Sequence, residues 1–191
     1  QGTWLVRIED TDIPRIYPNS ESHILNCIDA FEFEPDADII FQKNRLDLYE
    51  DVLEQLKQAQ QIYACECTRK QLGSNHIYVG TCRDLHLDFL NQAIRLKVDD
   101  QLICFDDLLQ GRQCSNLKND LGDFVLKRRD GIISYQLAVV VDDYLQGITH
   151  VVRGADLLDN TARQTWLGCL LNYPSLSYMH LPLAMNDQGQ K

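Results

Sequence analysis

The 191-residue sequence lacks a long hydrophobic run. Its longest apolar stretch, residues 137–141, has the size of a core strand or of part of a core helix, whereas a membrane-spanning helix needs roughly 18 apolar residues. Internal repeats and low-complexity tracts are also missing, and the apolar share of 45% is enough to build a packed core. These features exclude fibrous and disordered chains, and we expect no membrane partner.

Positive charge is also scarce, because 18 lysines and arginines stand against 28 acidic residues and give a net charge of −10. Since non-specific nucleic-acid binding depends on neutralising phosphates with basic side chains, this total argues against a nucleic-acid partner. A local basic patch nevertheless occurs at residues 127–129, with the sequence Lys-Arg-Arg. Such a patch can dock a structured nucleic acid on an acidic protein.

The seven cysteines are odd in number and scattered, which is typical of a reducing compartment rather than of a disulfide framework. The chain begins at Gln1 without a methionine, and nothing at this end resembles a signal peptide. It stops just after a turn-like stretch at residues 186–190. We therefore expect a cytoplasmic protein and a portion of a longer chain.

Hydrophobic periodicity predicts an α/β fold in which strands and helices alternate at both ends of the chain. We expect a first core part over residues 1–60, a small β-rich insertion over 61–120 and a second core part over 121–191. The predicted helices lie over residues 20–31, 44–59 and 160–171. The predicted strands lie over residues 4–8, 62–64, 93–98, 102–105, 124–126, 148–152 and 181–185, and in the strand at 93–98 Arg95 and Lys97 alternate with the apolar positions.

The most specific chemical signal is a cysteine cluster. Cys65 and Cys67 are two positions apart in an extended segment, so their side chains point the same way, and Cys82 returns on a loop. Three thiolates favour zinc, and His76 is the ordinary fourth ligand while Tyr78 is an unusual one. The alternative is three unconnected thiols, but a thin insertion with little core gains folding energy from a structural metal.

Three further features are ambiguous when taken alone. The acidic cluster at residues 9–12 follows a strand, which is a common site position in open α/β sheets but is also typical of a solvated turn. Tyr135 can recognise a small polar ligand or can lie half-buried at a core boundary. Arg153 ends a strand and can hold a carboxylate in bidentate fashion, or can pair with Asp156 or Asp159.

In their order along the chain, these motifs resemble the glutamyl-tRNA synthetase superfamily of class I aminoacyl-tRNA synthetases. The resemblance covers essentially the whole chain and rests on RIEDTD at residues 7–12, the cysteine cluster at 65–82, YQLAVVVDD at 135–143, ITHVVRGADL at 148–157 and HLPLA at 180–184. RGADL in place of RG(E/D)DH, together with the ending Asn-x-Gln-Gly-x-Lys, is more similar to short paralogues that lack an anticodon-binding domain.

The resemblance implies a Rossmann-like nucleotide-binding core with a zinc-bearing insertion. It also implies that L-glutamate is activated by ATP with Mg²⁺ to glutamyl-adenylate and is transferred to the queuosine of tRNA(Asp). We expect a monomer.

The resemblance also implies roles for particular residues. Glu9 would hold the α-ammonium group of glutamate, Arg153 would bind a carboxylate, and Tyr135 would line the same pocket. The zinc ligands would be Cys65, Cys67, Tyr78 and Cys82, so the resemblance selects Tyr78 over His76 as the fourth ligand.

Two motifs of the superfamily are absent from this chain. The HIGH-type ATP motif would precede the first strand, and the KMSKS-type motif would begin at Lys191. We therefore assign no catalytic residue and expect that this piece alone does not activate glutamate. Two alternatives remain: a fragment of a tRNA-charging glutamyl-tRNA synthetase acting on tRNA(Glu), and a zinc-stabilised tRNA-binding module without catalysis.

Overall fold

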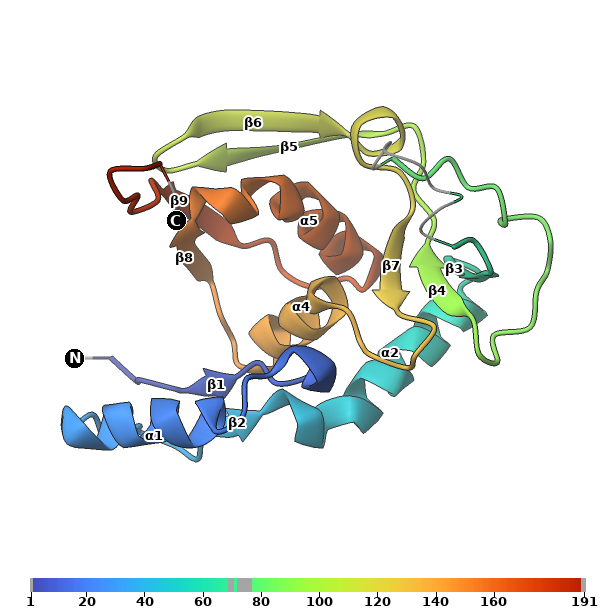
Figure 1. Ribbon diagram of the computed structural model, residues 1–191. Helices are drawn as coiled ribbons and strands as arrows, with labels where there is room; N and C mark the ends of the chain where they lie inside the picture. Colours follow the sequence, from blue (N-terminus) through green and yellow to red (C-terminus); the bar gives the residue numbers. More distant parts are fainter. Residues whose placement is uncertain (1, 69–70, 72–76, 190–191) are drawn as a thin grey trace. The chain divides into compact units, whose positions relative to one another are not determined.

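The computed structural model describes residues 2–68, 71 and 77–189 (Figure 1). The chain divides into two compact units, residues 1–52 and 53–191, and the boundary falls inside helix α2 (Leu46–Gln58). Among the described residues, none of the helices combines the length and the apolar character that crossing a membrane would require.

The first unit contains a short parallel pair, β1 (Arg7–Ile8) and β2 (Ile40–Phe41), and helix α1 (Ser20–Ala30). The strand predicted over residues 4–8 is shorter in the structure, because the backbone of Trp4 bonds with Asp36 instead of continuing the ladder. Two 3₁₀ turns complete the unit, at Ile13–Arg15 and Gln42–Arg45.

The second unit contains an antiparallel sheet in the order β3-β4-β7. Its strands are β3 (Ile62–Cys65), β4 (Ala93–Leu96) and β7 (Phe124–Lys127). Strand pairing therefore crosses the boundary that the sequence predicts at residue 120. Strand β7 belongs to this sheet because its side chains at Phe124 and Leu126 are buried in the core.

A second sheet has the order β6-β5-β9-β8 and consists of β5 (Leu102–Asp107), β6 (Gly111–Asn116), β8 (His150–Gly154) and β9 (Ser177–Leu181). The β5–β6 hairpin is antiparallel, whereas β9 is parallel to both β5 and β8. The strand predicted over residues 181–185 is wrong in position. Pro182 has no N–H to continue the ladder, and the buried positions of β9 are Tyr178 and His180.

The helices of the second unit are α4 (Tyr135–Leu145) and α5 (Thr161–Leu170), and Figure 1 shows α5 beside the β5–β6 hairpin. The apolar run at residues 137–141 is helical because the Ser134 side chain caps the first turn by accepting the N–H of Leu137. A 3₁₀ helix at Ala155–Asn160 precedes α5, and a π-helical turn at Leu117–Leu121 follows β6. The mixed α/β fold class predicted from the sequence is confirmed.

One cysteine pair differs from the expectation of free thiols. Cys104 and Cys114 lie directly opposite each other on β5 and β6, with their Cα atoms 4.1 Å apart, and form a disulfide. The register of the hairpin brings them together, and a register is not visible in cysteine spacing. The other five cysteines are free.

Arg95 also differs from its expected position on the exposed side of β4, because only 6% of it is exposed. Its guanidinium lies over the ring of Tyr78, with Cζ 4.0 Å from the ring centroid. Its Nη1 donates to the backbone oxygen of Asp123 at 2.9 Å. The ring face and the carbonyl compensate the buried charge.

Asp123 is buried, with only 2% of the residue exposed. Its carboxylate connects several segments of the second unit. It accepts hydrogen bonds from the hydroxyl of Tyr63, from the guanidinium of Arg83 and, at 2.9 Å, from the backbone N–H of Val98. Because Arg83 directly follows Cys82, this carboxylate fixes the cysteine loop to the antiparallel sheet.

We expect Asp123→Asn to lower the free energy of unfolding by about 3 kcal/mol, because it leaves a largely buried guanidinium without its carboxylate. The Arg83 side chain is 28% exposed, which places the loss at the lower end of the range for buried pairs. Urea unfolding measures the change. Asp130→Asn, in the exposed pair with Arg128, is the control and should cost less than about 1 kcal/mol. Equal losses in the two variants would contradict the prediction.

Candidate functional site

The three thiols of the predicted metal cluster converge in the second unit. The Sγ atoms of Cys65, Cys67 and Cys82 all lie within 4.8 Å of one another, as the spacing in the sequence predicts. The hydroxyl oxygen of Tyr78 lies 3.4 Å from the sulfur of Cys65 and 3.4 Å from that of Cys67. The sulfurs of Cys67 and Cys82 are also 3.4 Å apart.

Backbone contacts hold Tyr78 in this position. Its hydroxyl accepts the N–H of Cys82 at 3.0 Å, and its backbone pairs with that of Gly122 in an isolated bridge. Gly122 has a φ of +64°, and a Cβ atom there would lie 2.6 Å from the backbone N and O of Tyr78. Only glycine permits this approach.

The chemistry of the cluster fits a metal ion that prefers sulfur. Burial raises the pKa of the Cys67 thiol and the pKa of the Tyr78 hydroxyl, so both groups need a nearby cation to become anionic ligands. Four ligands around zinc at about 2.3 Å would lie roughly 3.8 Å from one another, which is close to the observed separations. His76, the other candidate ligand, lies outside the described residues.

The second cluster surrounds Arg153 at the carboxyl end of β8. Each of its five guanidinium N–H groups has an acceptor within 3.3 Å. The acceptors are His180 Nε2 at 3.0 Å, Gln164 Oε1 and Thr161 Oγ1 at 2.8 Å, and the Tyr135 hydroxyl and Leu157 backbone oxygen at 3.3 Å. The structure therefore brings Tyr135 and Arg153 together.

All five acceptors of Arg153 are neutral groups. The imidazole of His180 accepts at Nε2 and is therefore uncharged. The pairing with Asp156 or Asp159 that the sequence leaves open is not among these contacts. A guanidinium held in this way keeps its full positive charge available to a ligand.

Glu9 lies in the first unit, at the carboxyl end of β1, and its side chain is 43% exposed. Its Oε1 is 3.5 Å from Nη2 of Arg7. The neighbouring Asp10 is buried and accepts the backbone N–H of Lys43 at 2.9 Å. Of the two carboxylates, Glu9 is the one accessible to a ligand.

Sequence reasoning missed four of the polar residues at the Arg153 cluster: Asp107, Thr161, Gln164 and His180. His180 entered the sequence analysis only as the first residue of the HLPLA motif at 180–184, and the resemblance assigned it no role. Asp107 carried a local signal for a turn before Gly111, because aspartate side chains accept N–H groups two or three positions ahead. No spacing rule connects Asp107 with His180.

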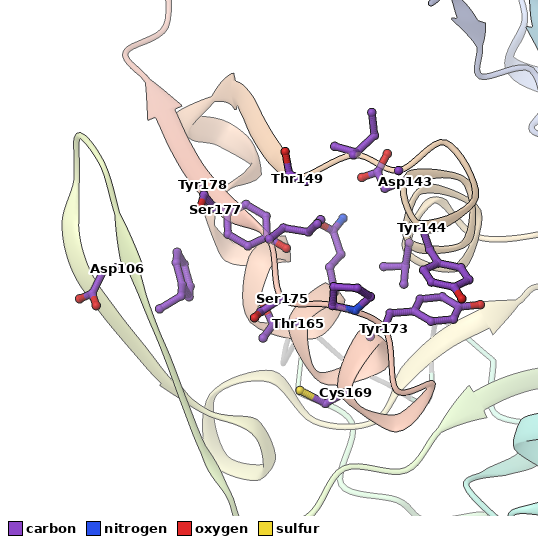
Figure 2. Close-up of a pocket in the computed structure, with 18 of the residues that line it drawn as sticks. Asp106, Asp143, Tyr144, Thr149, Thr165, Cys169, Tyr173, Ser175, Ser177 and Tyr178 are labelled. Carbon is purple, nitrogen blue, oxygen red and sulfur yellow. The ribbon is translucent and has the colours of Figure 1, made fainter.

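A cavity of about 630 Å³ lies between β5, α4, α5 and the amino ends of β8 and β9 (Figure 2). Figure 2 shows Tyr144 and Tyr173 together on one side of it, and their rings stack with centroids 3.8 Å apart. Neither Tyr135 nor Arg153 lines this cavity, although Gln164 lines it and also bonds to Arg153.

The basic patch at residues 127–129 already has contacts within the protein. Arg128 pairs with Asp130, and Arg129 donates to the backbone oxygen of Glu66 at 2.6 Å. The second contact places a positive charge beside the segment between Cys65 and Cys67.

Comparison with known proteins gives consistent matches. The family model of the class I tRNA synthetase (E and Q) catalytic domain matches residues 1–191. A glutamyl-Q tRNA(Asp) synthetase of Acinetobacter baylyi is 78% identical over 191 residues, which is 100% of this chain and 65% of that protein. A glutamyl-Q tRNA(Asp) synthetase of Cupriavidus metallidurans is 48% identical over 203 residues, with 100% of this chain and 66% of that protein covered.

Among solved structures, a glutamate tRNA ligase from Elizabethkingia meningosepticum in complex with its amino acid is similar, with a TM-score of 0.85 and 26% identity. The match covers 100% of this chain and 45% of that one. The chain thus spans about two thirds of the length of the curated relatives named above, at 65% and 66%.

Proposed function

Because the chain belongs to the class I tRNA synthetase (E and Q) catalytic-domain family, we propose that the protein containing it activates L-glutamate with ATP and transfers the glutamyl group to the queuosine of tRNA(Asp). The observation that carries the amino-acid part is the Arg153 guanidinium, whose five hydrogen-bond acceptors are all neutral and include the hydroxyl of Tyr135. The names of two relatives support the queuosine part.

Arg153 binds a carboxylate of glutamate in this proposal. Hydrogen bonds weaken towards the long end of their distance range, so the two contacts at 3.3 Å, to Tyr135 and Leu157, are the ones that a carboxylate replaces. The Tyr135 hydroxyl can then donate its own proton to the same carboxylate. Glu9 holds the α-ammonium group, since a carboxylate is the natural partner of an amino group.

Activation needs no covalent enzyme intermediate. The α-carboxylate of glutamate attacks the α-phosphorus of ATP in line, glutamyl-adenylate forms, and pyrophosphate leaves. The protein contributes orientation and electrostatic stabilisation, and Mg²⁺ accompanies ATP because of its phosphate charge. A hydroxyl of the queuosine cyclopentenediol then attacks the glutamyl carbonyl, and AMP leaves.

Cys65, Cys67, Tyr78 and Cys82 would hold a structural zinc ion, and four protein ligands leave no open position for chemistry. The ion would cross-link the end of β3 to the loop that contains Tyr78 and Cys82. The tRNA partner would meet the protein through local basic groups such as residues 127–129, since the overall charge is −10.

The test uses the full-length protein. Glutamate-dependent ATP–pyrophosphate exchange without tRNA should occur, and labelled glutamate should pass to queuosine-containing tRNA(Asp) but not to tRNA(Asp) whose diol has been cleaved by mild periodate. Transfer to tRNA(Glu) instead would indicate a tRNA-charging synthetase. Failure of the exchange reaction would leave only a binding module.

A further inference from the structure

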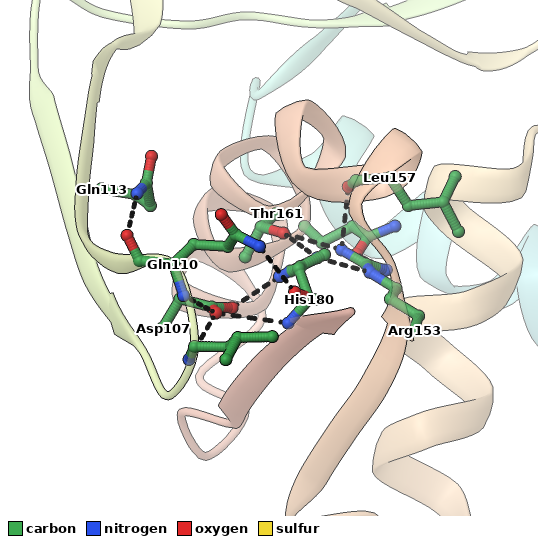
Figure 3. Close-up of polar contacts among 9 residues, drawn as sticks. Asp107, Gln110, Gln113, Arg153, Leu157, Thr161 and His180 are labelled. Carbon is green, nitrogen blue, oxygen red and sulfur yellow. Dashed lines mark hydrogen bonds and ion pairs between the residues drawn. The ribbon is translucent and has the colours of Figure 1, made fainter. Parts of the chain in front are cut away.

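The contacts around Arg153 continue to a buried carboxylate on the turn of the β5–β6 hairpin. Asp107, which is 4% exposed, has its Oδ2 atom 2.6 Å from Nδ1 of His180, and His180 is fully buried. Nε2 of His180 in turn lies 3.0 Å from Nε of Arg153. Figure 3 shows this chain of contacts, in which β5, β9 and β8 each supply one member.

The positions of the protons follow from the donors and acceptors. Arg153 can only donate, so Nε2 of His180 accepts and the imidazole proton is on Nδ1, where it is donated to Asp107. Burial raises the pKa of Asp107, but the N–H of Gln110 and the contact with His180 outweigh it and hold the pKa at about 2. The carboxylate is therefore charged at neutral pH.

The orientation of the Asp107 carboxylate is fixed as well. Its Oδ1 atom accepts the backbone N–H groups of Leu109 at 3.0 Å, Gln110 at 2.8 Å and His180 at 3.2 Å. Only Oδ2 therefore faces the imidazole ring. In addition, the side chain of Gln110 donates to the backbone oxygen of His180 at 2.9 Å, which fastens the turn to β9.

We propose that Asp107 and His180 are positioning residues for the substrate carboxylate, which they serve by orienting Arg153 without neutralising it. A carboxylate in direct contact with Arg153 would compete with the substrate. A neutral imidazole between the two charges fixes the plane of the guanidinium and leaves its charge for the ligand. The inference rests on the proposed function of Arg153 and adds that the β5–β6 hairpin determines how well glutamate binds.

Asp107→Asn is the decisive variant. The amide oxygen must stay on the side of the Leu109 and Gln110 N–H groups, so the NH₂ group faces Nδ1 of His180. The imidazole proton then moves to Nε2, where it opposes the Nε–H of Arg153. We expect KM for glutamate in the exchange reaction of the full-length protein to rise about tenfold to a hundredfold, with kcat changed less than about threefold.

Two substitutions of His180 form a matched pair. Glutamine can place an oxygen where Nε2 lies and so preserves an acceptor for Arg153, whereas asparagine reaches only the Nδ1 position and loses that acceptor. We expect His180→Gln to keep KM within about threefold of the unmodified protein and His180→Asn to raise it like Asp107→Asn. In the His180→Gln background, Asp107→Asn should add little. A merely structural role would instead make KM follow the loss of stability in all these variants.

A spectroscopic readout keeps this inference separate from the proposed function. The ¹⁵N shifts of the His180 ring should report a proton on Nδ1 in the unmodified protein and on Nε2 in Asp107→Asn. Normal exchange with an unchanged KM in Asp107→Asn, or an unchanged tautomer, would overturn the inference. Absence of any exchange in the unmodified protein would instead overturn the proposed function.

Discussion

Replacing Arg153 by alanine should lower kcat/KM for glutamate in the exchange reaction about a thousandfold. Truncating one partner of a buried, hydrogen-bonded charge pair costs roughly 2–5 kcal/mol, and every 1.4 kcal/mol is a factor of ten. The effect should appear mainly in KM, because the guanidinium contacts the carboxylate in the ground state and in the transition state alike. The measurement is pyrophosphate exchange with the full-length protein over a range of glutamate concentrations.

A second substitution of Arg153 distinguishes the effect of its positive charge from the effect of its planar shape. Arg153→Lys keeps the positive charge but loses the planar fork that reaches Tyr135, Thr161 and His180 together, so most of the loss should remain. Arg112→Ala, which removes an exposed arginine on β6, is the control and should leave KM unchanged. A lysine variant with normal KM would show that charge alone binds the carboxylate.

Removing one of the proposed zinc ligands should have the largest effect on folding. Cys82→Ser should reduce bound zinc from about one equivalent per chain to well below one, because structural zinc sites contribute binding energy directly to folding. A loss of 3 kcal/mol or more would lower the melting temperature by roughly 10 °C in a protein of this size. Elemental analysis without chelators and thermal unfolding measure the two quantities.

The control for this variant is Cys169→Ser. It changes an exposed free cysteine, so it should affect neither zinc content nor stability.

The variants Tyr78→Phe and His76→Ala determine which residue is the fourth ligand. Tyr78→Phe should weaken zinc binding and His76→Ala should not, since the Tyr78 hydroxyl lies 3.4 Å from two of the sulfurs. Well under one equivalent of zinc in the unmodified protein would contradict the metal site.

Helices α1, α2 and α5 were predictable because their signals are local, whereas α4 was not assigned, because the apolar run at residues 137–141 fits a strand as well as a helix. Capping residues and amphipathic spacing place α1, α2 and α5 within a few residues of their observed bounds. The last strand was predicted too late in the chain, because the apolar residues at 181–185 look like a core strand. In the structure Leu181 and Met185 are exposed, and the buried side chains are Tyr178 and His180.

The candidate site was predictable only where its residues belong to recognisable motifs. The cysteine spacing led directly to the thiol cluster, and the resemblance to synthetases singled out Tyr135 and Arg153. Asp107 and the residues around it were missed, because its partner His180 is 73 positions away and the two meet only through the pairing of β5 with β9. Such tertiary pairing leaves no periodic trace in a single sequence.

The parallel pairing of β5 with β9 has a consequence for how the protein folds. Joining segments 73 residues apart requires a large loop to close, and pairings of this kind form late because the lost chain entropy is recovered only when the contacts are complete. We therefore expect the contacts around Arg153, where the proposed amino-acid site lies, to form at the end of folding rather than with the individual helices. If glutamate binds there as proposed, it binds only the fully folded chain, and we expect it to stabilise that chain against unfolding.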